Sequence, residues 1–300
     1  MLFNSALEEI FRKVEWEGKG IIINGERISN LRFADDVILL ANSATEIVEM
    51  IKELEIYGKE AGLTMNRLKT KILVRDSNSR QQIQQIIGKE TEINTVTEAS
   101  YLGQQITFKN RMEKEINVRI AKAWAKFWSL REVLKGKFKN YHKSQIFNMC
   151  VVPTLTYGCQ TWTLDTKIVS KLRTTQNSME RAMLSIKRRN HVRITTIKRE
   201  LKDNMDVIKF LRRQKWKWAG HVARMKDERW TYKTTFWYLT HRQRRRGRQT
   251  GRWKDDIDRF LQTKNFQKIA TNRTEWDRLQ ETFPHFGPRN IINKKAMYLY

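Results

Sequence analysis

The segment Phe33-Ala34-Asp35-Asp36 places two adjacent carboxylates between the largely apolar residues 31–34, which include Arg32, and the apolar run 37–41. Aspartate favours turns, so the pattern predicts a β-hairpin that carries Asp35 and Asp36 at its turn. Carboxylate oxygens are the ligands that Mg²⁺ prefers. Two metal ions about 4 Å apart can stabilise both the attacking and the leaving oxygen of a phosphoryl transfer. Most Asp-Asp pairs are solvated turn residues, so the tetrapeptide alone leaves a purely structural role open.

The segments on either side of this turn predict the elements that must position it. Apolar residues near helical spacing predict a helix over 2–16. Asn24-Gly25 is a strong hairpin signal, because both residues tolerate positive φ. Ser43 and Glu46 form the pattern of a capping box, in which side chains bond the first free amides of a helix. Gly62 can close that helix in a left-handed conformation.

The period of the apolar residues changes near residue 109. Before it, residues 71–74 predict a strand, the Gln-rich segment 75–89 predicts a loop with a short helix, and residues 95–108 predict a small hairpin around Gly103. After it, apolar residues recur at helical spacing, with one helix ended or kinked at Pro153. The pattern predicts an α+β part with an antiparallel sheet, followed by an all-helical part.

The charge of the chain indicates the class of its partner. There are 59 Lys and Arg against 32 Asp and Glu, a formal charge of +27. Residues 1–60 nevertheless hold 7 basic and 12 acidic residues, so the cations concentrate in the rest of the chain. Such an excess attracts phosphate backbones, although a basic surface alone also fits ribosomal and chromatin proteins. With only two cysteines, the sequence excludes a disulfide framework and a zinc knuckle. No apolar run is long enough to cross a bilayer.

In the order of its motifs, the chain resembles the C-terminal part of the reverse transcriptases of LINE-type non-LTR retrotransposons. LEEIFRKVEWEGKGIIINGERISNLRFADDVILLA is similar to the end of motif B, the following hairpin and motif C; GLTMNRLKTKIL is similar to motif D; and ASYLGQQIT is similar to motif E, the primer grip. PTLTYGCQTW, WAGHVARM and GRQTGRWKDD resemble segments of the thumb and C-terminal region of those elements.

The resemblance implies a fold class and a division of the chain. Residues 1–108 would be the C-terminal half of a polymerase palm, an α+β part with antiparallel hairpins. Residues 109–190 would form an all-α thumb. Residues 191–300 would form a basic, Trp-rich helical region that binds nucleic acid.

The resemblance also implies roles for individual residues. Asp35 and Asp36 would be the metal-site aspartates of motif C, and Phe33 would lie beside the primer end. Lys69 would be the general acid that protonates the departing pyrophosphate. Lys71 lies two residues away and could take that role instead, or both could be solvated surface lysines. Primer contact would come from Tyr101, Leu102 and Gly103, whose alternative role is packing within a hairpin.

The chain begins inside the segment that resembles motif B, so the motif A carboxylate and the fingers are expected to be missing. The implied activity is metal-dependent nucleotidyl transfer by an RNA-directed DNA polymerase, with Mg²⁺ (Mn²⁺ as a substitute), an RNA template, a DNA primer and dNTPs. The chain alone is expected to be inactive. The alternative is a non-catalytic remnant or repurposed protein that binds RNA or DNA.

A basic segment near the C-terminus favours nucleic-acid binding independently of the resemblance. Between Lys209 and Lys254 there are 16 Lys or Arg, two acidic residues and five interleaved tryptophans. Cations can follow phosphates while aromatic faces stack on unpaired bases; alternatively, the tryptophans are core residues and the cations a solvated face. The candidate contacts are Arg212, Arg213, Lys215, Lys217, Arg244, Arg245, Arg246 and Arg248. The run 242–248 also resembles a nuclear-import patch, which predicts a nuclear and cytoplasmic protein.

Overall fold

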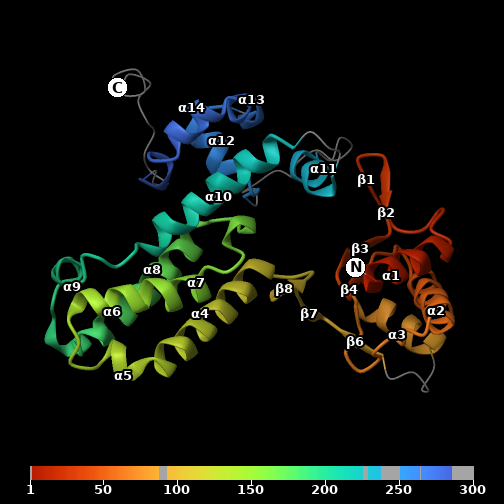
Figure 1. The fold of residues 1–300 in the computed structure, drawn as a ribbon, viewed down its shortest axis with the longest axis horizontal. Helices are drawn as coiled ribbons and strands as arrows, with labels where there is room; N and C mark the ends of the chain where they lie inside the picture. Colours follow the sequence, from red (N-terminus) through yellow and green to blue (C-terminus); the bar gives the residue numbers. More distant parts are fainter. Residues whose placement is uncertain (1, 88–92, 226–228, 238–250, 264, 286–300) are drawn as a thin grey trace. The chain divides into compact units, whose positions relative to one another are not determined.

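The computed structural model describes residues 2–87, 93–225, 229–237, 251–263 and 265–285 (Figure 1). The chain divides into two compact units. Unit 1 comprises Met1–Arg111 and Lys233–Arg242, and unit 2 comprises Met112–Tyr232 and Gln243–Tyr300.

Unit 1 is an α+β unit built from short strands and helices. Its elements in chain order are α1 (Leu2–Lys13), β1 (Ile21–Ile23), β2 (Glu26–Ile28), β3 (Asn30–Phe33), β4 (Asp36–Leu39), α2 (Ala44–Glu60), β5 (Lys71–Leu73), α3 (Ser77–Ile87), β6 (Asn94–Val96), β7 (Glu98–Tyr101) and β8 (Gln104–Thr107).

The strands of unit 1 form separate pairs instead of the antiparallel sheet that the sequence predicted. β1–β2, β3–β4 and β7–β8 are antiparallel hairpins, whereas β5 and β6 pair in parallel. The prediction that Thr95 and Val96 belong to the hairpin around Gly103 was therefore wrong. Parallel strands need a long crossover, which is usually a helix, and the Gln-rich segment supplies it as α3. Buried Ile83 fixes that helix against Ile72 and Ile51.

Local turn and capping signals of the sequence are confirmed. Asn24 and Gly25 have φ of 53° and 84°, the left-handed values that a tight hairpin turn requires. The Ser43 side chain accepts a hydrogen bond from the Glu46 N–H at 3.1 Å and so caps α2. The Glu46 carboxylate does not complete the capping box; instead it accepts from the backbone N–H of Asn42 at 2.8 Å and thereby fastens the chain that follows β4.

Unit 2 contains only helical elements among its described residues. They are α4 (Arg111–Ser129, which begins at the last residue of unit 1), α5 (Arg131–Leu134), α6 (Asn140–Ile146), the π-helical turn η1 (Phe147–Val151), α7 (Val152–Leu155), η2 (Cys159–Thr161), α8 (Thr166–Met183), η3 (Arg188–Asn190), α9 (Ile194–Glu200), α10 (Val207–Ala223), α11 (Trp230–Phe236, whose last residues belong to unit 1), α12 (Asp255–Leu261), α13 (Phe266–Ala270), α14 (Arg273–Leu279) and η4 (Phe283–His285).

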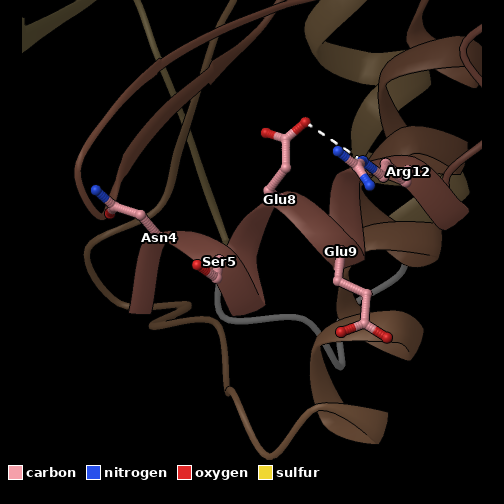
Figure 2. A pocket seen from close by; sticks show the side chains of 5 residues that line it. All are labelled: Asn4, Ser5, Glu8, Glu9 and Arg12. Atoms are coloured by element: carbon pink, nitrogen blue, oxygen red, sulfur yellow. Dashed lines mark ion pairs between the residues drawn. The ribbon is translucent and has the colours of Figure 1, made fainter. Parts of the chain in front are cut away.

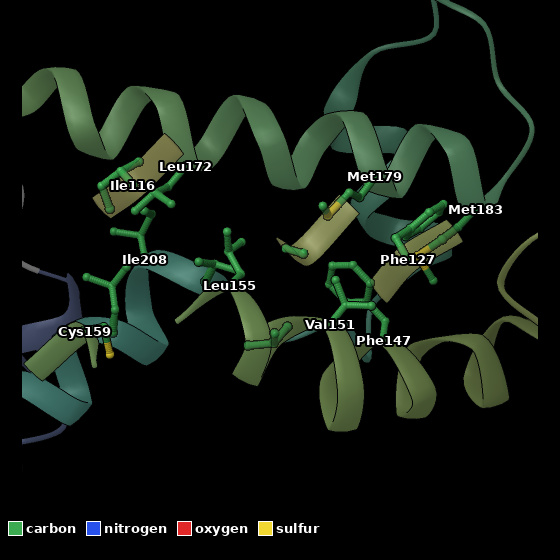
Figure 3. Packing of buried hydrophobic residues seen from close by; sticks show 14 of the residues in the cluster. Ile116, Phe127, Phe147, Val151, Leu155, Cys159, Leu172, Met179, Met183 and Ile208 are labelled. Atoms are coloured by element: carbon green, nitrogen blue, oxygen red, sulfur yellow. The ribbon is translucent and has the colours of Figure 1, made fainter. Parts of the chain in front are cut away.

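One apolar core joins α4, the α6–α7 segment, α8 and α10. Figure 3 shows Leu172, Met179 and Met183 of α8 facing Phe147 and Val151, all of them nearly or fully buried. Ile197, Leu201 and Ile208 belong to the same cluster. The structure therefore draws residues from both predicted regions, 109–190 and 191–300, into one unit. The names palm and thumb stay predictions.

Pro153 was predicted to end or kink a helix, and it lies where the helix changes its winding. The π-helical turn Phe147–Val151 passes into α7, with Pro153 in the first turn. Proline has no N–H, so it is accommodated best at the first helical positions. None of the helices in the described parts of the chain is long and apolar enough to cross a membrane.

Candidate active site

The Asp35–Asp36 pair lies at the end of the β3–β4 hairpin, as predicted. Phe33 pairs with Asp36, which leaves Ala34 and Asp35 as a two-residue loop. Ala34 has φ of 52°, a left-handed value that is uncommon for a residue with a side chain. Both aspartates are exposed. The tight loop therefore presents two carboxylates to solvent at adjacent positions.

Contacts with α1 hold the hairpin in place. Arg32 of β3 forms an ion pair with Glu8 at 2.7 Å, and its guanidinium lies 4.6 Å from the centre of the Phe11 ring. Figure 2 shows Glu8 with Arg12, its other ion-pair partner at 3.7 Å, beside a surface depression that Asn4, Ser5 and Glu9 also line. The five lining residues belong to α1 and are exposed. The depression contains none of the predicted site residues.

The two carboxylates fit a magnesium ion whose remaining ligands come from water or substrate. Mg²⁺ typically binds through one or two carboxylates and keeps several waters or substrate phosphates as further ligands. Asp35 and Asp36 can supply these two carboxylates. Among the residues that the structure describes, no group of three or more His, Cys, Asp or Glu side chains could hold a metal. A two-metal site would therefore need carboxylate ligands beyond those that the described residues bring together.

An aromatic residue and a second hairpin accompany the carboxylates. Phe33 is 61% exposed and directly precedes the turn. In the β7–β8 hairpin, Leu102 and Gly103 form the loop with φ of 47° and 74°. Burial, and secondarily the negative charge of Asp36, raise the pKa of the Tyr101 phenol. The charge of Asp36 thus acts on Tyr101. The segments that resemble motifs C and E therefore lie near each other within unit 1.

Lys69 stands apart from this group. It is exposed and lies in a turn before β5, where its backbone N–H donates to Asn66 Oδ1 at 3.1 Å. Lys71 is the first residue of β5. In the described part of the chain, no hydrogen bond or ion pair joins the Lys69 side chain to the aspartates. Its role as a general acid stays a prediction.

The cations of α10 divide into two groups. Arg213 and Lys217 are exposed, as a phosphate contact requires. Arg212 is half-buried and donates to the Pro284 carbonyl oxygen at 3.2 Å. Burial is the largest cause of the lowered pKa of its guanidinium. Trp216 is fully buried. The remaining candidates, Arg244, Arg245, Arg246 and Arg248, lie outside the described residues.

The structure contradicts the predicted nucleic-acid contact of Lys215. Only 1% of this residue is exposed, and its ammonium donates to both carboxylate oxygens of Asp256, at 2.7 and 2.9 Å. It also lies 5.2 Å from the centre of the Trp253 ring. The sequence carried a signal for this burial, since Lys215 lies on the apolar stripe of α10, four residues after Leu211 and four before Ala219.

Sequence reasoning missed the contact that joins α10 to the C-terminal helices. The rings of Trp216 and Trp276 stack with centroids 3.8 Å apart. Each indole N–H also donates to the backbone carbonyl of the other tryptophan, at 2.9 and 3.2 Å. These two tryptophans are structural and cannot stack on bases. No local pattern reveals such a pair, because its members are 60 residues apart.

Comparisons with known proteins identify the family of the chain. Residues 1–106 match the family model described as "Reverse transcriptase (RNA-dependent DNA polymerase)". A transposon-derived protein of Caenorhabditis elegans is 33% identical over 267 residues, which cover 85% of this chain and 95% of that protein. The match of the family model includes both aspartates and all but the last residue of the β7–β8 hairpin. The similarity to the nematode protein extends over most of the chain. The chain therefore belongs to the reverse transcriptase (RNA-dependent DNA polymerase) family, among its transposon-derived members.

Proposed function

We propose that the chain is the C-terminal part of an RNA-directed DNA polymerase of a non-LTR retrotransposon. Asp35 and Asp36 bind the divalent metal, and Phe33 and Tyr101 lie against the primer end. The observation that carries this proposal is the two-residue hairpin loop, which exposes adjacent carboxylates beside Phe33 and near Tyr101. Helices of unit 2 and the basic segment then support the template and primer.

The residues of the chain divide the work of the proposed reaction. The aspartates supply oxygen ligands, and a bound Mg²⁺ would neutralise charge that develops on the phosphate oxygens. Phe33 offers an exposed ring on which the terminal base can pack. Like an ordinary tyrosine, Tyr101 is protonated at neutral pH, and burial raises its pKa further, so its hydroxyl can donate a hydrogen bond to the primer backbone.

Nucleotidyl transfer at this hairpin would require carboxylates in addition to Asp35 and Asp36. In-line transfer needs metal ions held in a fixed geometry, and positioning supplies much of the rate. The described residues bring only Asp35 and Asp36 together at the hairpin. We therefore expect the 300-residue chain to show no extension of a primed RNA template with Mg²⁺ or Mn²⁺. A longer chain that supplies the third carboxylate and the fingers is expected to extend the primer.

Primer extension with matched variants tests the roles of the two aspartates. In the active longer chain, Asp35→Ala or Asp36→Ala should abolish extension, while Asp277→Ala, which removes an exposed carboxylate of α14, should leave it unchanged. Extension by the 300-residue chain, lost on Asp35→Ala, would show that no further carboxylate is required. Equal loss in all three variants would refute the metal-site assignment.

A second candidate function, nucleic-acid binding without catalysis, rests on exposed cations of α10 and not on the aspartate hairpin. If the longer chain stays inert, the protein is better described as a remnant that binds RNA or DNA without catalysis. The exposed cations Arg213 and Lys217 favour such binding whether or not the hairpin is active.

Nuclear import is a separate proposal that rests on the basic run at 242–248. A fluorescent fusion of the full chain should enter the nucleus. Replacing Arg244, Arg245 and Arg246 by glutamine should leave it in the cytoplasm, whereas unchanged nuclear signal would refute the assignment.

A further inference from the structure

Unit 2 includes the segment in which α4 ends and α5 leads into α6 (Figure 1). This segment carries several exposed aromatic and basic side chains. Trp128, Phe138 and Tyr141 are 47%, 52% and 53% exposed. The same chain segment carries the exposed cations Lys126, Arg131, Lys135, Lys137 and Lys139. We call these eight residues the aromatic–basic surface. It lies outside both the hairpin and the basic segment discussed above.

The rings of this surface are held in place by local structure. Trp128 stacks on Trp124 with centroids 5.9 Å apart, and the ammonium of Lys135 lies 5.5 Å from the centre of the Trp128 ring. Gly136 permits the approach of Phe138, because a Cβ at Gly136 would overlap the Glu132 carbonyl oxygen and lie 3.1 Å from the Phe138 ring. Preformed rings lose little side-chain freedom when they bind a partner.

Charge identifies the kind of partner that this surface fits. Residues 126–142 contain five Lys or Arg and a single acidic residue, Glu132. Clustered exposed rings on a monomer mark interaction sites. Cations beside exposed rings match a strand that offers phosphates and unstacked bases at once, whereas a duplex keeps its bases stacked inside. An acidic protein partner would satisfy the cations but would leave the exposed rings without bases to stack on.

We propose that the aromatic–basic surface binds an unpaired RNA strand, with bases stacked on Phe138 and Tyr141 and phosphates on Lys135, Lys137 and Lys139. The choice of RNA rests on the proposed function, in which RNA is the template. The binding itself does not require polymerase activity, because the surface belongs entirely to unit 2. The strand would be template that has not yet been copied.

Binding of labelled oligo(U) to the full chain, measured by fluorescence anisotropy, tests the proposal. The double variant Phe138→Ala, Tyr141→Ala should weaken binding by about 25-fold or more, because the loss of each stacked base costs about 5-fold or more. The double variant Phe138→Trp, Tyr141→Trp should bind like the parent chain, because tryptophan also offers a flat ring for stacking. Replacing Lys135, Lys137 and Lys139 by glutamine should reduce the slope of log affinity against log salt by about 2.

A control variant with the same loss of charge distinguishes binding at the aromatic–basic surface from general attraction between a basic protein and RNA. Replacing Lys167, Arg173 and Lys268, which are exposed elsewhere on unit 2, removes the same charge and should change the affinity for oligo(U) much less. Equal losses in both triple variants, an unchanged affinity in the ring variant, or tighter binding of duplex RNA than of oligo(U) would each overturn the proposal. So would a surface that binds oligo(dT) but not oligo(U). The anisotropy assay requires no primer extension, so a failed polymerase assay leaves the binding result interpretable.

Discussion

Lys215 and Asp256 form a buried ion pair in which one partner is nearly inaccessible. The Lys215 side chain is 1% exposed and that of Asp256 is 22% exposed. Burial lowers the pKa of Lys215, and the charge of Asp256 opposes that effect. Taking such charges out of water costs free energy that only their pairing offsets. The pair therefore ties α12 to α10 only while both members are present.

Removing one partner should destabilise the fold more than removing both. Asp256→Asn leaves the Lys215 ammonium without its counter-charge and should lower the free energy of unfolding by about 3–5 kcal/mol. The double variant Lys215→Met, Asp256→Leu should lie much closer to the parent, since apolar replacements of buried pairs are often neutral. Denaturant titrations followed by tryptophan fluorescence measure both. A double variant as unstable as Asp256→Asn would contradict this account.

Glu180 predicts a pH dependence of stability. It is 1% exposed, and burial is the main cause of the raised pKa of its carboxyl; hydrogen bonds from Gln176 and Asn204 oppose the shift. Because the folded state holds this proton more tightly than the unfolded state, the contribution is fully present below the ordinary pKa. It is lost as the pH rises above about 4.5 through the raised folded value. Glu180→Gln should remove this part of the decline in unfolding free energy. A variant with the parent's full slope between acidic and neutral pH would refute the prediction.

At the scale of elements, the WAGH segment of α10 is built around close contact with α14. A Cβ at Gly220 would overlap the Trp276 indole nitrogen and would lie 2.7 Å from Cδ1 of the same ring. The glycine therefore permits the stacking of Trp216 and Trp276. Helix α10 also packs against η2 and α8, so it links the C-terminal helices to the rest of unit 2. A displacement of Trp276 would therefore weaken the attachment of α14 to this unit.

Gly220→Ala should accordingly destabilise unit 2 by about 1–3 kcal/mol, the usual cost of forcing extra volume into a packed site. Gly251→Ala is the matched control, because a Cβ there would meet only the Thr163 Cγ2 at an ordinary 3.7 Å. Thermal unfolding of the two variants should differ clearly. If Gly220→Ala unfolds like Gly251→Ala, the Trp216–Trp276 contact tolerates displacement and does not hold α14.

Elements that depend on adjacent residues could be predicted from the sequence, whereas distant pairings could not. The Asn24-Gly25 turn, the Ser43 cap and the aspartate hairpin follow from the φ preferences and hydrogen-bonding capacity of the residues at the turn itself. The parallel pairing of β5 with β6 depends on α3 crossing between them, and a Gln-rich segment gives only a weak helical signal.

The candidate site shows the same division. The positions of Asp35, Asp36 and Phe33 follow from the hairpin, but the proximity of Tyr101 to Asp36 depends on how two hairpins pack. The buried partner of Lys215 lies 41 residues away in the chain. A count of basic residues cannot distinguish a cation that faces solvent from one that completes a core.

For the whole molecule, the uneven distribution of charge governs how nucleic acid is bound. The excess of cations lies beyond residue 60, while the first 60 residues, which include Asp35 and Asp36, are acidic overall. Phosphate backbones should therefore be held mainly by the later part of the chain. Repulsion from the acidic part would oppose contact at the hairpin unless metal ions were bound there.

Sequence-tolerant binding of RNA and DNA with a steep salt dependence is expected. Each phosphate contact releases counterions, so log affinity should fall linearly with log salt between about 50 and 200 mM. Replacing Arg213 and Lys217 by glutamine should reduce the slope, while Lys215→Gln should change stability more than slope, because Lys215 is buried. A flat response to salt would mean that this part of the chain is not the binding surface.

The separation of Trp216 from Trp276 has a consequence during protein synthesis. The two stacked rings are 60 residues apart in the chain. At about 5–20 residues per second, the ribosome would add Trp276 roughly 3–12 s after Trp216. During that interval α10 exposes an indole that the finished protein buries completely. The nascent chain therefore exposes an aggregation-prone apolar surface for seconds. Chaperones that bind such surfaces should raise the yield of folded protein.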